Sequence, residues 1–166
     1  MMNKAIRKTL ACLAVLHAVA AGTAVAQGTS SMSEQQITRV GTQPSAAGPS
    51  DSFTGRVRID RVWPSDEKIN ASGALVTFEP GARSAWHTHP AGQRLVVTSG
   101  VGLTQEWGKP VQVIRPGDVV WCPPNVKHWH GAAETTAMTH LAVTGTADGK
   151  NVTWMEKVSD EQYNAR

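Results

Sequence analysis

The chain has 166 residues, a length that suits one domain rather than two of ordinary size. Its formal charge of +3 arises at the beginning of the chain, where three of the 16 bases precede all 13 acids. Beyond residue 26 the bases and acids are equal in number, so we expect no nucleic-acid partner.

Residues 1–26 have the organisation of a secretory signal peptide. A basic segment with Lys4, Arg7 and Lys8 is followed by an apolar, alanine-rich run that ends in Ala24-Val25-Ala26. The alternative is an uncleaved anchor, but the run is short and weakly hydrophobic for a membrane span. We therefore expect cleavage by the general bacterial secretory route, a periplasmic or secreted protein, and no membrane association of the mature chain.

Short β segments dominate the rest of the chain. Residues 27–50 are predicted to be a flexible lead, with a possible edge strand over 35–40 and a loop over 41–52, and residues 51–166 to form one domain. Evenly spaced short strands with Gly and Pro between them predict an all-β sandwich or barrel. The expected strands are residues 55–60, 73–79, 94–99, 101–106, 111–114, 119–122 and 137–144. Only residues 159–164 are predicted to be helical, because Ser159 can cap an acidic first turn.

Cysteine and tryptophan raise two further expectations. Cys122 is the single cysteine after residue 26, and it ends an apolar segment before two prolines. We expect it to be a buried small side chain rather than a nucleophile. Most of the six tryptophans are expected on the outer sheet face or at a subunit interface.

The candidate chemistry lies in the five histidines that follow residue 26. His87 and His89 are separated by one residue, as are His128 and His130. On a strand, residues i and i+2 point to the same face, so each pair projects into one space. His140 lies on another predicted strand. Imidazole is the commonest metal ligand among side chains, so this pattern predicts a metal site rather than packing histidines.

At these residues the sequence resembles the cupin superfamily. The first cupin motif is matched by Gly81, His87-Thr-His89, Gln93 and Gly100 with the correct spacing. The second motif is matched more loosely, by the residues Gly117, Pro123, Asn125 and His128. The family usually has Glu in place of Gln93, Gly in place of Asn125 and Asn in place of Ala132. The resemblance implies a small single-domain jelly-roll barrel, or double-stranded β-helix, here followed by the short C-terminal helix.

A narrower resemblance covers residues 38–163. The segments 53–60, 86–93, 117–121, 127–132, 135–141, 154–156 and 160–163 are similar to bacterial cupin hydroxynitrile lyases. Those enzymes cleave or form (R)-cyanohydrins such as mandelonitrile, and they use manganese. The resemblance implies a metal-dependent lyase acting on a cyanohydrin, and a homodimer or homotetramer, which is common among cupins of this size.

The resemblance also implies a metal site held by His87, His89, Gln93 and His128. The ion is expected to be Mn²⁺, with Fe²⁺, Ni²⁺ and Zn²⁺ as alternatives that the same donors accept. Because Gln replaces Glu, the ligand set is neutral, which strengthens the ion as a Lewis acid and weakens its retention.

The remaining histidines are expected to be catalytic, with His140 favoured as general base and His130 as the hydrogen-bond partner of departing cyanide. The sequence leaves open the exchange of these two roles and a purely structural role for His130. Small and apolar side chains are expected to line a substrate cavity beside them. These are Ala74, Val76, Met138, Ala142 and Thr144.

Two other functions are compatible with the same residues. One is an Fe(II)-dependent cupin dioxygenase that acts on a small phenolic or diketone. The other is a non-enzymatic periplasmic module that binds a small molecule or the metal. His130 and His140 argue against the second, because buried histidines beyond the ligand set cost free energy without a task.

Overall fold

The computed structural model describes residues 34–165. The predicted signal peptide, residues 1–26, lies outside the described residues, and so does the beginning of the lead. Residues from Ile37 onward form one compact unit. Among the residues that the structure describes, no helix has the length and hydropathy needed to cross a membrane.

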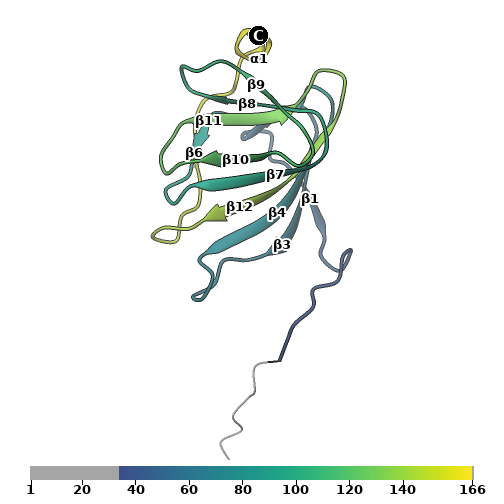
Figure 1. Ribbon diagram of the computed structural model, residues 1–166, viewed down its shortest axis with the longest axis vertical. Coiled ribbons are helices and arrows are strands. Elements are labelled where there is room, and N and C mark those ends of the chain that lie inside the picture. Colours follow the sequence, from purple (N-terminus) through teal and green to yellow (C-terminus); the bar gives the residue numbers. More distant parts are fainter. Residues whose placement is uncertain (1–33, 166) are drawn as a thin grey trace, which may run out of the picture. The chain divides into compact units, whose positions relative to one another are not determined.

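The unit is built from two antiparallel sheets that curl around a shared interior (Figure 1), so the predicted all-β barrel is confirmed. The six-stranded sheet has the order β1 (Ser45–Ala47), β3 (Val57–Trp63), β4 (Ala71–Phe78), β12 (Met138–Gly145), β7 (Gln93–Gly100) and β10 (Val119–Cys122). The second sheet has the order β13 (Thr153–Trp154), β6 (His87–Thr88), β11 (His128–Ala132), β5 (Arg83–Ser84) and β2 (Phe53–Thr54). In the second sheet β8 (Gly102–Glu106) also pairs with β11, and β9 (Gln112–Ile114) pairs with β8.

Strand register divides the inner face of the six-stranded sheet into rows of side chains. Inward-facing residues of β3, β4 and β12 lie opposite one another, because antiparallel partners share a face. In chain order along β3, the rows are Val57–Phe78–Met138, Ile59–Val76–His140 and Arg61–Ala74–Ala142, and a further row joins Ser72, Thr144 and Gln93. The row of Val57, Phe78 and Met138 belongs to the apolar core. From this row to the row of Arg61, Ala74 and Ala142, the apolar side chains become smaller.

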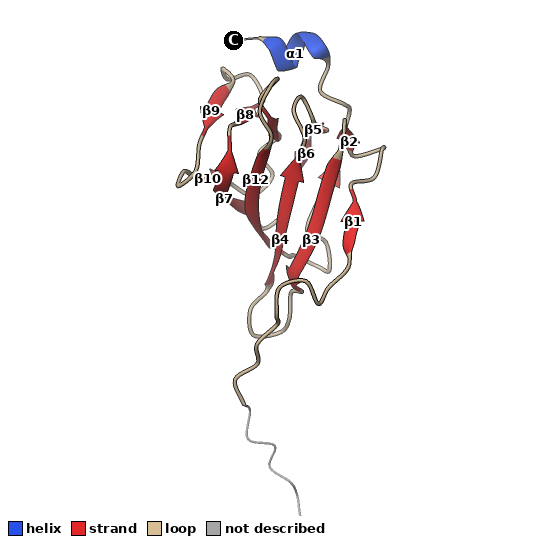
Figure 2. Cartoon of the chain, turned by 90° about the vertical axis from the view of Figure 1, so that its right-hand side faces the viewer, coloured by secondary structure: helices blue, strands red, loops and turns tan. Residues whose placement is uncertain are grey.

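A second core cluster lies under the C-terminal helix, α1 (Asp160–Asn164), at one end of the barrel (Figure 2). Ser159 caps the helix as predicted, in a reciprocal capping box with Gln162. Tyr163 packs on Trp129 with ring centroids 5.8 Å apart, and both belong to the cluster that contains Trp86. Trp86 and Trp129 are fully buried in this cluster. Trp129 alternates with the inward-facing His128 and His130 along β11, so it lies on the outer face of its sheet as expected, where the helix covers it.

The edge strand of the six-stranded sheet is displaced from its predicted position. Residues 35–40 form no strand, and the edge is β1 at Ser45–Ala47, where a loop was expected. Pairing with β3 continues beyond β1, since Gly48 N donates to Val57 O at 2.8 Å. An edge strand forms where the chain reaches the open side of its neighbour, and side-chain pattern does not reveal that position.

Two turns explain how the cupin motifs are built. Gly100 has a φ of 79°, and a Cβ there would lie 1.8 Å from Ala137 O. Asn125, where the motif usually has Gly, has a φ of 61°, in the left-handed region that Asn tolerates better than most residues. Its backbone N donates to His89 O at 2.9 Å. The substitution therefore preserves a turn that holds a histidine segment in place.

Candidate active site

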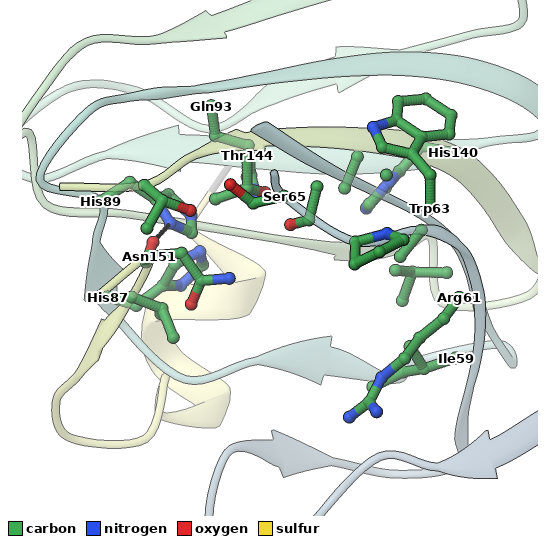
Figure 3. Close-up of a pocket in the computed structure, with 18 of the residues that line it drawn as sticks. Ile59, Arg61, Trp63, Ser65, His87, His89, Gln93, His140, Thr144 and Asn151 are labelled. Atoms are coloured by element: carbon green, nitrogen blue, oxygen red, sulfur yellow. Dashed lines mark hydrogen bonds between the residues drawn. The ribbon is translucent and has the colours of Figure 1, made fainter. Parts of the chain in front are cut away.

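A cavity of about 670 Å³ opens on the inner face of the six-stranded sheet. It lies at the end of β3, β4 and β12 where the rows contain the small side chains Ala74 and Ala142. Ala74, Val76, Ala142 and Thr144 line it, as expected from the sequence. The polar lining includes His87, His89, Gln93, His130 and His140. Figure 3 shows the labelled histidines, Gln93 and Thr144 around the same space. The segment from His87 to Gln93 and the later segment that contains His130 and His140 thus contribute to one site, and the sequence pattern singled out both.

Met138 does not lie where it was expected. It is fully buried in the core and is not part of the cavity lining. It lies in the row of Val57 and Phe78, two rows away from Ala142, and a Cβ on Gly102 would lie 2.8 Å from its Cγ. The alternation along β12 was predicted correctly, so Met138 does face the interior. Whether an inward-facing residue lines the cavity or the core depends on how Phe78 and the other sheet pack against it.

Three histidine rings are held in place by a hydrogen bond between their Nδ1 atom and a backbone carbonyl. The Nδ1–H groups of His87, His89 and His128 donate to Ala85 O (2.9 Å), Asn151 O (2.5 Å) and Val126 O (2.8 Å). Because a carbonyl oxygen can only accept, each Nδ1 carries the proton and each Nε2 keeps its lone pair. The Nε2 atoms of His89 and His128 are buried, and no described residue forms a hydrogen bond with them. Such anchoring orients imidazoles for metal binding.

Gln93 supplies a fourth atom that can bind a metal ion, the side-chain oxygen Oε1. Its Nε2 donates to Thr144 Oγ1 at 2.9 Å, which directs the amide, while its Oε1 is buried with no hydrogen-bond partner in the part of the chain that the structure describes. A buried polar atom without a partner costs free energy unless something binds it. The donor set of imidazole nitrogens and one amide oxygen therefore fits a divalent transition-metal ion.

The histidines also cluster in a second way. One ring nitrogen from each of His87, His128 and His130 lies within 4.8 Å of the others, so these three could hold a metal ion. The rings of His87 and His128 are 4.3 Å apart, and those of His87 and His89 are 5.0 Å apart. His87 and His128 thus belong both to this cluster and to the ligand set that the resemblance implies. The third histidine is His130 in the cluster and His89 in the implied ligand set.

His130 and His140 form a buried pair beside these donors. His140 Nε2 lies 3.1 Å from His130 Nδ1, and within residues 34–165 the remaining nitrogens, His130 Nε2 and His140 Nδ1, have no hydrogen-bond partner. Phe78 contacts both rings, with centroid distances of 5.7 and 5.6 Å. The pair therefore lies on an apolar floor and presents its free nitrogens within the site.

Burial keeps these imidazoles uncharged. It lowers the pKa of His128 and of His140 from 6.5 to about 4, and it lowers the pKa of His87 and His130 well below the ordinary value. Burial also lowers the pKa of His89, although its hydrogen bond to Asn151 and the Gln93 side chain oppose the shift. All five histidines are neutral near pH 7, the form required for metal ligation and for accepting a proton.

Cys122 takes no part in this site. Its side chain is buried and it is not among the cavity lining residues. Burial, with a smaller effect of the Glu106 carboxylate, raises the pKa of its thiol to about 12. The thiol is therefore a packing group, as its sequence context indicated.

The sequence analysis missed several cavity residues from β3 and from the segment before α1. Arg61, Trp63, Asn151 and Trp154 all line the cavity. Alternation along residues 57–61 could have placed Arg61 on the inner face with Val57 and Ile59. Asn151 could not have been found, because it acts through its backbone carbonyl.

The fold and the site together define a cupin. Residues 74–144 match the model of the cupin domain family. The structure resembles that of a cupin-like protein from Thermotoga maritima, with a TM-score of 0.67 and 40% identity over 78% of this chain and 95% of that one. The polyketide cyclase RemF from Streptomyces resistomycificus shares the fold alone, with a TM-score of 0.60 and 11% identity over 78% of this chain and 91% of that one. The chain belongs to the cupin superfamily.

One relative narrows the assignment within that superfamily. An (R)-mandelonitrile lyase from Granulicella tundricola is 60% identical over 128 residues, which cover 77% of this chain and 98% of that protein. At this identity over nearly the whole relative, the chain is an enzyme of the same hydroxynitrile lyase-like cupin group.

Proposed function

We propose that the protein is a metal-dependent lyase that cleaves or forms a cyanohydrin, with an aldehyde and cyanide as the other reaction partners. The observation that carries the proposal is the juxtaposition of unpaired donor atoms with a neutral histidine pair. His89 Nε2, Gln93 Oε1 and His128 Nε2 lack partners on one side, and His130 and His140 lie beside them in the same cavity. The similarity to a named (R)-mandelonitrile lyase supports the same reaction.

The residues that would hold the ion are His87, His89, Gln93 and His128. We favour His89 over His130 as the third imidazole because backbone carbonyls fix the tautomers of His87, His89 and His128. The Nδ1 of His130 instead faces another imidazole, which fixes no tautomer. When bound, a divalent ion supplies Lewis-acid stabilisation of negative charge on the substrate oxygen. We propose Mn²⁺ as that ion.

The His130–His140 pair can supply one proton acceptor and one donor at the same time. Each neutral ring carries one proton, and one of these protons lies in the hydrogen bond between them. If His140 Nε2–H donates, His140 Nδ1 keeps a lone pair and His130 Nε2 carries a proton. His140 then removes the hydroxyl proton, and His130 donates to cyanide as the carbon–carbon bond breaks. The opposite tautomer exchanges the two roles.

The walls of the cavity suit a small, mostly apolar substrate. Val76, Ala142 and Ile59 line it next to the histidines, and Trp63 and Trp154 contribute aromatic surface. Ala74 and Ala142 lie opposite each other in register, which leaves room for a ring between the sheets. Apolar walls orient the substrate and exclude water from the reacting atoms.

The test is benzaldehyde release from racemic mandelonitrile at mildly acidic pH by the mature protein, loaded with Mn²⁺ or stripped with a chelator. We expect release that requires metal and consumes one enantiomer. Absence of release from protein shown to contain stoichiometric Mn²⁺ would overturn the proposal. Oxygen uptake by the Fe²⁺-loaded protein with phenolic or diketone substrates would then be measured.

His130 and His89 variants test the ligand set. We expect His89→Ala to lose metal and His130→Gln to retain it, as measured by elemental analysis after gel filtration. The reverse result would assign the ion to the cluster of His87, His128 and His130.

A further inference from the structure

The inner face of β3 carries a cation, Arg61, that has no partner among the described residues 34–165. Alternation along the strand places Arg61 on the same face as Ile59, and register sets Arg61 opposite Ala74 of β4. All three residues line the cavity, and Figure 3 shows Arg61 beside Ile59. Arg61 thus occupies a position that follows two inward-facing apolar residues, Val57 and Ile59, on the same strand.

The charges on the outer face of β3 are paired, but Arg61 is not. Arg58 Nε lies 3.0 Å from Asp60 Oδ2 on the outer face. Within residues 34–165, no ion pair or hydrogen bond engages the Arg61 side chain. The cavity lining contains no Asp or Glu and no other Lys or Arg. The mouth of the cavity therefore carries one positive charge that no side chain neutralises.

Arg61 makes no contact with the histidines that would let it take part in proton transfer: within residues 34–165, no hydrogen bond or cation–π contact joins them. Its row of the sheet is adjacent to the row of Ile59, Val76 and His140. Strand geometry places the backbone of Arg61 roughly 12 Å from that of His140, one row along and two strands across. A single aromatic ring can span the space between an arginine side chain and a group held at the histidines. A guanidinium binds a carboxylate through two parallel hydrogen bonds.

We propose that Arg61 is a specificity-determining residue that selects aldehydes and cyanohydrins carrying a carboxylate at the end remote from the reacting carbon. The inference rests on the proposed lyase function for its reaction, but the anion-binding position rests on Arg61 and the cavity charge alone. Arg61 acts on binding, so it affects KM for carboxylated substrates more than kcat. Salt screens an exposed charge, so the preference decreases with ionic strength.

The first measurement compares 4-carboxybenzaldehyde with the uncharged 4-formylbenzamide in cyanohydrin formation by the Mn²⁺-loaded protein. We expect wild type to favour the carboxylate, and Arg61→Gln to raise KM for it about tenfold, the effect of one charge-assisted contact, with kcat and the amide substrate changed less than twofold. Arg61→Lys should recover part of the loss. Arg58→Gln, on the same strand but the opposite face, is the matched control and should behave as wild type.

A second measurement does not depend on turnover. Binding of 4-(hydroxymethyl)benzoate to chelator-stripped protein is followed by calorimetry for wild type, Arg61→Gln and Arg58→Gln. Weaker binding only in Arg61→Gln supports the anion position even if no lyase activity is found. If benzaldehyde is turned over but the carboxylate gives no preference that depends on Arg61, the inference is wrong and the proposed function remains. Equal benzoate binding by all three proteins also overturns the inference.

Discussion

His140 Nε2 and His130 Nδ1 lie 3.1 Å apart, and each ring has a second, buried nitrogen to which no described residue is hydrogen-bonded. The two residues come from different sheets, β12 and β11, and meet over Phe78. This contact turns two isolated imidazoles into a unit with one acceptor and one donor at its ends. The predictions below begin with this pair.

His140→Gln should retain metal and lose turnover by about 100-fold or more, the usual contribution of a general acid or base. The glutamine amide can still donate to His130 Nδ1, so the fold of the site is preserved while the base is removed. Metal content is measured beside kcat. Loss of metal from this variant would show that His140 belongs to the ligand set.

Gln93→Glu should bind metal about tenfold more tightly and turn over about tenfold more slowly, because a carboxylate adds negative charge at the ion. Affinity is measured by competition with a chelator, and kcat with mandelonitrile. Thr144→Val is the control, since it removes the hydrogen bond that directs the amide but leaves its charge unchanged. A Gln93→Glu protein as active as wild type would contradict the argument from charge.

Ala142→Leu should exclude aromatic substrates from the cavity. Ala142 lies opposite Ala74 in the row next to His140, so three added carbons fill the space meant for a ring. We expect kcat/KM for mandelonitrile to fall about tenfold or more, while that for acetaldehyde cyanohydrin changes little. An equal loss for both substrates would indicate a damaged fold instead of a narrowed cavity.

The metal-free protein should lose stability as the pH falls from about 6.5 towards 4. Burial lowers the pKa of His140 to about 4, so the unfolded chain binds a proton in this range and the folded chain does not. For His140 alone, linkage predicts that the free energy of unfolding falls by about 2 kcal/mol between pH 7.5 and pH 5. Urea unfolding at both pH values measures it, and His140→Gln should show a correspondingly smaller fall.

Cys122 should resist thiol reagents in the native protein. Burial raises the pKa of its thiol to about 12, so almost no thiolate forms at pH 8. Titration with a disulfide reagent should label it only in urea. Rapid labelling of the folded mature protein would show that β10 opens locally at its end.

The histidine pattern alone predicted much of this protein. Side chains two residues apart on a strand share a face, so the pairs His87/His89 and His128/His130 had to be directed into common spaces whatever the details of the barrel. Gly100, which separates two predicted strands, likewise marked its turn through local backbone preferences. Short-range periodicity and turn chemistry are properties of the sequence itself, and they predicted an all-β fold and a histidine metal site. The particular ligand set with Gln93 was implied by the cupin resemblance.

Only the tertiary structure decided how those segments meet. Register between β3, β4 and β12 placed Arg61, Ala74 and Ala142 in one row and moved Met138 into the core, and no local pattern encodes register. The carbonyl of Asn151 fixes His89, and β11 brings His130 against His140, across 62 and 10 residues of chain. The sequence determined which residues carry chemistry, whereas packing between the sheets decided which nitrogens are left free to perform it.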